Sequence, residues 1–202
     1  HGEYFLSYLA DHGKINLLEI IFSMNFTIDD DHLLSLLISL LAKQNTTVDF
    51  INGLIQFDKI SNHCFDFQNL LPNGTSFFTA VNGSNPNISS IFQLFLQNGV
   101  DPNAPDANNC YPFEYAITTN STQLVQTLIN SGAIDYSKRL SLNNTYLHVA
   151  ARTSKQMYDF LSKFHLFPSN AKNDADQTPL DVFNSQKSCG PWCTSWSTQW
   201  GT

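Results

Sequence analysis

The stretch Asn170-Ala-Lys-Asn-Asp-Ala-Asp-Gln-Thr-Pro-Leu180 is the part of this sequence that decides the fold. It places turn-forming residues directly before a helix start at Thr178, and this order recurs upstream. The segment Thr145-Tyr-Leu-His-Val-Ala-Ala151 begins 33 positions before Thr178, and Tyr111 occupies the same place 34 positions before Thr145. A recurrence at so constant a spacing predicts a chain built from structural repeats.

These motifs resemble the ankyrin-repeat family, in which an Asn-Ala-Lys-Asp-like turn precedes a Thr-Pro-Leu-His helix start. The resemblance implies an all-α fold, an ankyrin-like solenoid of helix pairs with connecting β-hairpin loops. It also implies that His148 is structural, because the His of this motif forms hydrogen bonds that tie neighbouring loops together. Repeats of this family bind other proteins through surface residues that vary freely on one scaffold.

Six degenerate repeats cover most of the chain. Their starts lie near positions 4, 32, 75, 111, 145 and 178. Apolar periodicity predicts helices over 4–10, 17–22, 33–41, 48–55, 75–80, 91–96, 112–117, 124–129, 145–151, 157–164 and 178–183. We expect irregular structure to concentrate in residues 45–72. Because the helical pattern stops at Ser185 and Gly190-Pro191 breaks a helix, we predict a solenoid over 1–185 and a Cys- and Trp-rich cap or docking tail over 186–202.

Composition limits the partners of the chain. Hydrophobic residues make up 42%, with sixteen Phe, which predicts a packed aromatic core. Charged residues are only 13%, about half the usual share, and the formal net charge is −7 without any basic run. This balance argues against a nucleic-acid partner and against adhesion to an anionic membrane. The apolar run Leu33–Ala42 is too short for membrane insertion.

Catalytic and metal-binding motifs are not found. The sequence contains no nucleophile elbow, phosphate loop, metal-ligand cluster or paired-carboxylate motif, so we expect a protein without enzymatic activity and without a cofactor. Asp29-Asp-Asp31 is better interpreted as capping a helix N-terminus than as a calcium loop, which needs alternating ligands and a glycine.

Sequons for N-glycosylation recur in the predicted turns. The seven acceptors are Asn25, Asn45, Asn73, Asn82, Asn87, Asn120 and Asn143. Glycans at these positions would point to solvent and supply the solubility that Lys and Glu normally provide. This pattern predicts an extracellular or secreted protein. A cytoplasmic protein from an Asn-rich genome is the alternative.

Four cysteines suit disulfides in an extracellular protein. Cys189 and Cys193 form a C-x3-C pair, and Cys64 and Cys110 fall in loops of successive repeats. Zinc bound by these cysteines together with His63 is the alternative. The tail also resembles the opening of a thrombospondin type 1 module in its spaced Trp192, Trp196 and Trp200. It departs from that module because the Trp spacing is four rather than three, and the Arg residues that stack on the Trp are missing.

The sequence therefore predicts an extracellular, glycosylated ankyrin-like module for binding or assembly. Its partners would be proteins, copies of itself among them, and N-glycans would be attached covalently. The alternative is an intracellular ankyrin-like adaptor or effector.

Overall fold

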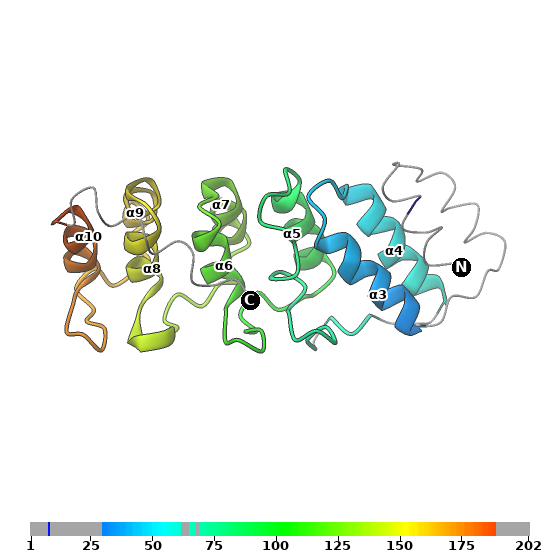
Figure 1. Ribbon diagram of the computed structural model, residues 1–202, viewed down its shortest axis with the longest axis horizontal. Helices are drawn as coiled ribbons and strands as arrows, with labels where there is room; N and C mark the ends of the chain where they lie inside the picture. The colour runs from blue at the N-terminus through cyan, green and yellow to red at the C-terminus, as the bar shows by residue number, and fades with distance from the viewer. Residues whose placement is uncertain (1–7, 9–29, 62–64, 68, 189–202) are drawn as a thin grey trace. The chain divides into compact units, whose positions relative to one another are not determined.

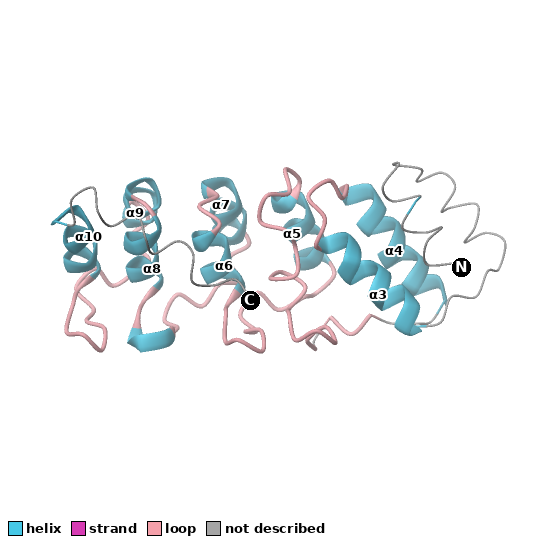
Figure 2. Ribbon diagram, viewed as in Figure 1, coloured by secondary structure: helices cyan, strands magenta, loops and turns pink. Residues whose placement is uncertain are grey.

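The computed structural model describes residue 8 and residues 30–61, 65–67 and 69–188. Within these residues the chain forms eight α-helices and one 3₁₀ helix, joined by turns and loops without a β-strand (Figures 1 and 2). The elements are α3 (Asp30–Leu41), α4 (Val48–Ser61), α5 (Ile88–Gln97), α6 (Pro112–Thr118), α7 (Thr122–Asn130), η1 (Ser141–Asn143), α8 (Tyr146–Thr153), α9 (Lys155–Ser162) and α10 (Pro179–Ser188). The expected all-α fold is confirmed.

Helix pairs occur where the periodicity predicts them in three of the repeats. They are α3 with α4, α6 with α7, and α8 with α9 (Figure 1). A single residue, Ser154, connects α8 to α9. It caps the C-terminus of α8 and the N-terminus of α9, where its hydroxyl accepts a hydrogen bond from the Met157 N–H. The repeat expected near position 4 lies outside the described residues.

The repeat that begins near position 75 departs from the prediction. The expected helix over 75–80 is a single turn, held by a hydrogen bond from the Ala80 N–H to the Ser76 carbonyl. Phe77 and Phe78 in this turn are both buried, and the loop over 82–87 follows at once. Packing of two large aromatic side chains thus replaces helix length as the source of burial in this repeat.

Two predicted boundaries also differ from the structure. The sequence predicts irregular structure over 45–72, but α4 runs for 14 residues within that range. Among the described residues, those between α4 and α5 (65–67 and 69–87) form turns and loops, so irregular structure begins later than predicted and extends beyond residue 72. In addition, α10 continues to Ser188, past Ser185, where the predicted helical pattern stops, so the division between 185 and 186 falls inside α10.

By the contacts between its residues, the chain divides into two compact units. The first comprises His1–Tyr115 with Gln123–Ile134, and the second comprises Ala116–Thr122 with Asp135–Thr202. The core of the first unit is aromatic, as the sixteen Phe predict. Its rings pack with centroid distances of 4.8 Å between Phe78 and Phe92 and 5.5 Å between Phe77 and Phe95.

The second unit is built around α8. This helix packs against both α9 and α10, and the small buried residues Ala150 and Ala151 allow the close approach. Phe183 of α10 stacks on Tyr158 of α9, with ring centroids 4.8 Å apart. Burial of these apolar side chains stabilises the three-helix arrangement that positions the loops described below.

Candidate functional site

Each described repeat from position 71 onward begins with the same closed turn. The N–H of one residue donates to the carbonyl four positions later, at 2.8 to 3.0 Å, in the pairs Leu71–Thr75, Asp106–Cys110, Leu140–Asn144 and Asn173–Gln177. The fourth residue of each turn has a positive φ angle; these residues are Gly74, Asn109, Asn143 and Asp176. Gly, Asn and Asp tolerate that conformation best, so the sequence specifies the turn directly. The expected β-hairpins are present as turns without strands in this part of the chain.

A capping pair follows each turn and begins the next helical segment. In the second unit the backbone N–H of Thr145 donates to His148 Nδ1 at 3.1 Å, and the Thr178 N–H donates to the Asp181 carboxylate at 2.9 Å. The pairs Ser76–Thr79 and Tyr111–Glu114 occupy the equivalent positions in the first unit. Such caps satisfy N–H groups that a helix start leaves unpaired.

His148 also connects two neighbouring turns, as its structural role predicts. Because Nδ1 accepts the Thr145 N–H, Nε2 carries the proton and donates to the Gln177 carbonyl at 2.9 Å. Burial lowers the pKa of His148, the Gln177 carbonyl opposes this shift, and the charge of Arg139 lowers the pKa further. His148 is therefore neutral at pH 7, and its role as a structural residue is confirmed.

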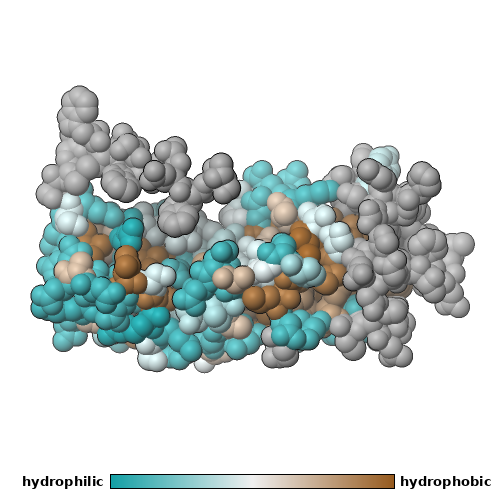
Figure 3. Space-filling model, turned by 60° about the horizontal axis from the view of Figure 1, so that its bottom comes forward, coloured by the Kyte–Doolittle hydropathy of each residue, from teal (hydrophilic) through white to brown (hydrophobic). Residues whose placement is uncertain are grey.

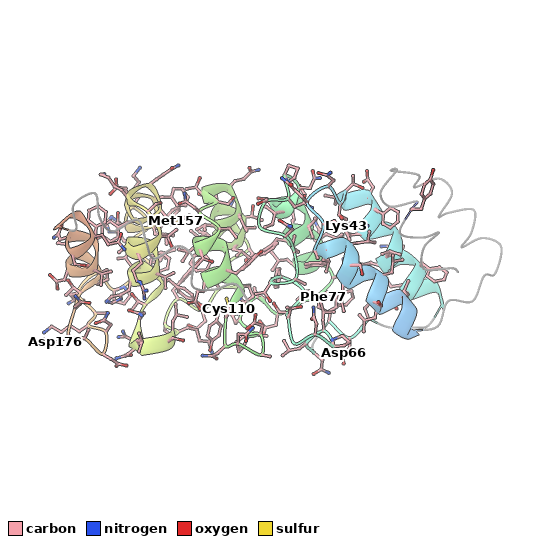
Figure 4. The ribbon with its side chains drawn as sticks, viewed as in Figure 1. Lys43, Asp66, Phe77, Cys110, Met157 and Asp176 are labelled. Atoms are coloured by element: carbon pink, nitrogen blue, oxygen red, sulfur yellow. The ribbon has the colours of Figure 1, made fainter. Side chains whose placement is uncertain are left out.

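Adjacent turns are held together by direct hydrogen bonds. In the first unit the Ala107 N–H donates to the Gly74 carbonyl at 2.9 Å. In the second unit the Asp174 N–H donates to the Leu142 carbonyl at 3.1 Å, and Asn173 Nδ2 donates to Asn144 Oδ1 at 3.1 Å. In each unit, two adjacent turns are thus hydrogen-bonded to each other. Figure 4 shows Asp176 at the outer end of the turn that precedes α10.

A groove of about 460 Å³ lies beside the turns of the second unit. Its lining comes from the turns over 142–144 and 173–177, from the end of α8 and from α10; the residues are Leu142, Asn144, Arg152, Asn173, Asp174, Ala175, Gln177, Val182, Ser185 and Gln186. Figure 3 shows apolar surface between polar rims in the part of the molecule that carries α8 and α10. A groove of this size is within the range of pockets that hold a small ligand or a side chain of a partner.

The lining divides into a scaffold and a set of available groups. The carboxamides of Asn144 and Asn173 are used inside the scaffold, and Gln186 Nε2 donates to the Arg152 carbonyl at 3.1 Å. The guanidinium of Arg152 and the carboxylate of Asp174 form no ion pair with any described residue, and both side chains are exposed. These two charges face solvent at the groove and are available to a ligand.

Leu142 is an unusual member of this lining. Its φ angle is 58° and it is 67% exposed. A left-handed conformation is costly for a branched aliphatic residue, and Leu gains nothing from burial here.

Charge is distributed unevenly along the sequence. Residues 135–188 contain seven Lys and Arg and five Asp and Glu, whereas residues 1–134 contain three Lys and Arg and twelve Asp and Glu. The ion pairs that the second unit forms among described residues are local, for example Lys172 Nζ to Asp176 Oδ1 at 2.9 Å. The groove therefore lies in the more basic part of an acidic chain.

The predicted glycan acceptors differ in exposure. Asn45, Asn73, Asn120 and Asn143 are exposed in turns or in η1, whereas Asn82 and Asn87 are half-buried, and Asn25 lies outside the described residues. Asn82 Nδ2 donates to the Ala42 carbonyl at 2.9 Å, and Asn87 Nδ2 contacts the Thr46 carbonyl at 3.4 Å. A glycan attached to Nδ2 would replace one of the two N–H donors of each of these carboxamides.

Cys110 is the one disulfide candidate that the structure describes. It is a free thiol, and burial together with the nearby Glu114 and Asp106 carboxylates raises its pKa to about 12. Such a thiol stays protonated at neutral pH and is a poor nucleophile. Cys64, Cys189, Cys193, His63, Trp192, Trp196 and Trp200 lie outside the described residues.

The sequence analysis above does not predict the groove. Arg152 and Gln177 carry no motif, and Leu142 differs from the turn residues that the repeat favours. A signal was nevertheless available, because Leu142 and Ala175 occupy the same turn position in consecutive repeats, 33 positions apart. Among the described residues, no three His, Cys, Asp or Glu side chains are grouped so as to hold a metal ion. No helix formed by those residues has the length and hydrophobicity to span a membrane.

Comparison with known proteins agrees with the repeat structure. A family model of ankyrin repeats in three copies matches residues 77–166. An ankyrin repeat protein of fowlpox virus (strain NVSL) is 32% identical over 96 residues, which cover 46% of this chain and 28% of the viral protein. Together with the repeated turns and caps, these matches identify ankyrin repeats over residues 77–166.

Proposed function

We propose that the chain is a binding module that engages a partner protein through the groove and turn tips of its second unit. The observation that carries this proposal is the groove itself. An exposed Leu142 lies there beside the charges of Arg152 and Asp174, while the surrounding amide groups fix the scaffold. Arg is enriched at the energetic centres of protein interfaces.

A displayed library of random peptides, selected on the native full chain, tests this function. We expect the selected peptides to lose binding to Leu142→Ser and to Arg152→Ala. They should keep it for Lys163→Ala, which removes an equivalent exposed charge from the C-terminal end of α9. If the selected peptides bind all four proteins equally, the groove is not the binding site.

We place this module outside the cell, with N-glycans attached to its turns. All six acceptors within the described residues lie in turns, loops or the short η1, which supports this placement. The alternative, an intracellular adaptor or effector, is favoured by the hydrogen bonds of Asn82 and Asn87 and by the free thiol of Cys110. Intact mass of the native protein before and after glycosidase treatment separates the two, since only the first predicts a loss of mass.

Copies of the chain are one candidate partner. The acidic excess of residues 1–134 and the basic excess of residues 135–188 favour contact between the acidic part of one copy and the basic part of another. Such an assembly would weaken as salt screens the charges. Light scattering across a salt series measures this, and a monomer at low salt and high protein concentration excludes it.

A further inference from the structure

We propose that Asn82 is a modification site, at which the chain deamidates spontaneously through the pair Asn82-Gly83. The Gly83 amide nitrogen attacks Asn82 Cγ, the bond from Cγ to Nδ2 breaks, and Nδ2 leaves as ammonia with the proton that Gly83 has lost. The resulting succinimide is opened by water at either of its carbonyl groups, which gives aspartate or isoaspartate. The reaction needs water alone as a second reactant, and it does not depend on the binding function proposed above.

The chain contains four Asn-Gly pairs, which begin at positions 52, 73, 82 and 98. Glycine after Asn favours this reaction, because a residue without Cβ leaves its own nitrogen open to close approach. The four pairs therefore share the same intrinsic chemistry. They differ in what the folded chain does with the N–H of each glycine.

The glycine N–H is engaged in three of the four pairs. Gly53 lies inside α4, where its N–H is bonded to the preceding helical turn. The Gly74 N–H donates to the Leu71 carbonyl at 2.8 Å, and the Gly99 N–H donates to the Leu96 carbonyl at 3.2 Å. Each of these bonds must open before the nitrogen can lose its proton and attack.

Gly83 is the exception. It is exposed in the turn over 82–85, which is closed by the Asn85 N–H donating to the Asn82 carbonyl at 2.9 Å. No hydrogen bond joins the Gly83 N–H to another residue in the part of the chain that the structure describes. The Ser84 N–H donates to Asn82 Oδ1 at 2.9 Å, and this donor stabilises the negative charge that develops on Oδ1 during the attack.

Asn73 is the matched comparison for Asn82. Its Oδ1 also accepts a backbone hydrogen bond, from the Thr75 N–H at 3.1 Å. Exposure alone would make Asn73 the faster site, because Asn73 is exposed and Asn82 is half-buried. The engaged Gly74 N–H predicts the opposite order, since opening one backbone hydrogen bond should slow Asn73 about 2- to 10-fold relative to Asn82.

The modification would weaken a contact between neighbouring repeats of the first unit. Asn82 Nδ2 donates to the Ala42 carbonyl at 2.9 Å, and the Asn82 backbone N–H donates to the Leu41 carbonyl at 2.8 Å. A carboxylate in place of the carboxamide sets an acceptor against the Ala42 carbonyl, so the first bond is lost. Isoaspartate also lengthens the backbone between positions 82 and 83. We therefore expect the loop over 82–87 to loosen from the connection between α3 and α4.

Mass spectrometry of the folded chain during incubation at mildly alkaline pH tests the inference. Production in a bacterial host leaves Asn82 Nδ2 without a glycan. Pepsin digestion at low pH stops the reaction, and cleavage at Phe77 or Phe78 separates the peptides of Asn73 and Asn82. We expect Asn82 to acquire the mass of a carboxylate first, as aspartate and isoaspartate. The rate should rise with pH, because the attacking nitrogen must lose its proton.

Two controls isolate the effect of the fold. In urea the four pairs lose their different settings and should react at similar rates. Gly83→Ala should slow the reaction of Asn82 in the folded chain, because a Cβ shields the nitrogen. Ala is compatible with the backbone at position 83, since the described glycines with a positive φ angle are Gly74, Gly99 and Gly132. The melting temperature should fall during incubation of the unchanged chain and stay constant in Gly83→Ala.

The order of the sites decides the outcome. A folded chain in which Asn73 reacts first, or at the same rate as Asn82, overturns the proposal. An Asn82 that stays intact in the folded chain while the chain in urea reacts also overturns it. If Asn82 is converted and the melting temperature does not fall, the expected loosening of the loop is wrong.

Discussion

The repeat that begins at Ser76 and the repeat that begins at Thr145 have the same start and different continuations. Both follow a closed turn, and both have a reciprocal cap between the first residue and the residue three positions later. After Thr145 the chain forms the eight residues of α8, whereas after Ser76 it forms one turn and enters the loop over 82–87.

Contacts to a neighbouring repeat account for the difference. Asn85 in the loop over 82–87 is 2% exposed, and its Nδ2 donates to the carbonyls of Lys43 and Thr46 at 3.3 and 3.1 Å. These bonds satisfy the carbonyl groups of the connection between α3 and α4. The comparison shows that the local sequence starts each repeat, while neighbouring structure determines how far its first helix extends.

The largest effect is expected from a charge in either core. Leu147→Asp in the second unit and Phe78→Asp in the first place a carboxylate at positions that are 1% and 0% exposed. The cost is about 3–5 kcal/mol because no partner is available to the buried charge. Ala150→Asp should behave in the same way. Thermal unfolding followed by circular dichroism measures the loss, and Gln156→Asp on the exposed face of α9 is the control. An ordinary melting temperature for Leu147→Asp would contradict the assigned core.

Asn85→Ala distinguishes the loop of the first unit from its turns. Removing the carboxamide leaves the Lys43 carbonyl without this donor and the Thr46 carbonyl with only the longer contact from Asn87 Nδ2, and we expect a loss of about 1–3 kcal/mol in the free energy of unfolding. Asn108→Ala, at an exposed turn position, should change stability by less than about 0.5 kcal/mol. If urea denaturation gives the same free energy of unfolding for Asn85→Ala and Asn108→Ala, Asn85 does not hold the loop.

A smaller effect, of opposite sign in the two regions, is expected with pH. Burial lowers the pKa of His148 from 6.5, so its stabilising contribution is complete above pH 6.5 and decreases as the pH falls below it. Burial, with a smaller contribution from Asp106, raises the pKa of Glu114 from 4.5, although the Tyr111 N–H opposes the shift. The contribution of Glu114 is therefore complete below pH 4.5 and decreases as the pH rises through its folded-state pKa.

His148→Gln and Glu114→Gln test this contrast, because Gln keeps an acceptor for the cap but does not titrate. Compared with His148→Gln, the unchanged chain should lose stability between pH 7 and pH 5. Compared with Glu114→Gln, it should gain stability as the pH falls towards 4.5. Denaturant titrations at several pH values give both slopes, and parallel curves for all three proteins would contradict the burial of these groups.

The smallest effect is expected at the turn of the last repeat. Lys172→Ala removes an exposed ion pair with Asp176 and should change the free energy of unfolding by less than about 0.5 kcal/mol. Asn173→Ala should cost about 1–2 kcal/mol more, because Oδ1 accepts from the Ala175 and Gln177 N–H groups and Nδ2 bonds to Asn144. If Lys172→Ala lowers the free energy of unfolding more than Asn173→Ala does, the turn is held by charge rather than by amide hydrogen bonds.

The sequence by itself determined the repeat register, the turns, the caps and the structural role of His148. The turns and caps depend on residues within about four positions of each other, so the pattern of Asn, Gly, Thr and Pro specifies them directly. The register and the role of His148, which bonds to Gln177 in the next turn, follow from the recurrence of that pattern every 33 or 34 positions. The lengths of the helices could be predicted less well from the sequence. The single turn at 76–80 results from burial of Phe77 and Phe78 and from bonds to residues about forty positions earlier.

Which residues line the groove is determined only by the tertiary structure. It joins Leu142, Arg152 and Gln186, which lie up to 44 positions apart, and no local pattern distinguishes them from ordinary surface residues. Their proximity arises because α8 packs against α10 and because the turn over 140–144 is hydrogen-bonded to the turn over 173–177. A repeat period sets which positions are equivalent, but the side chains available to a partner emerge only after neighbouring repeats have used the others in packing and hydrogen bonds.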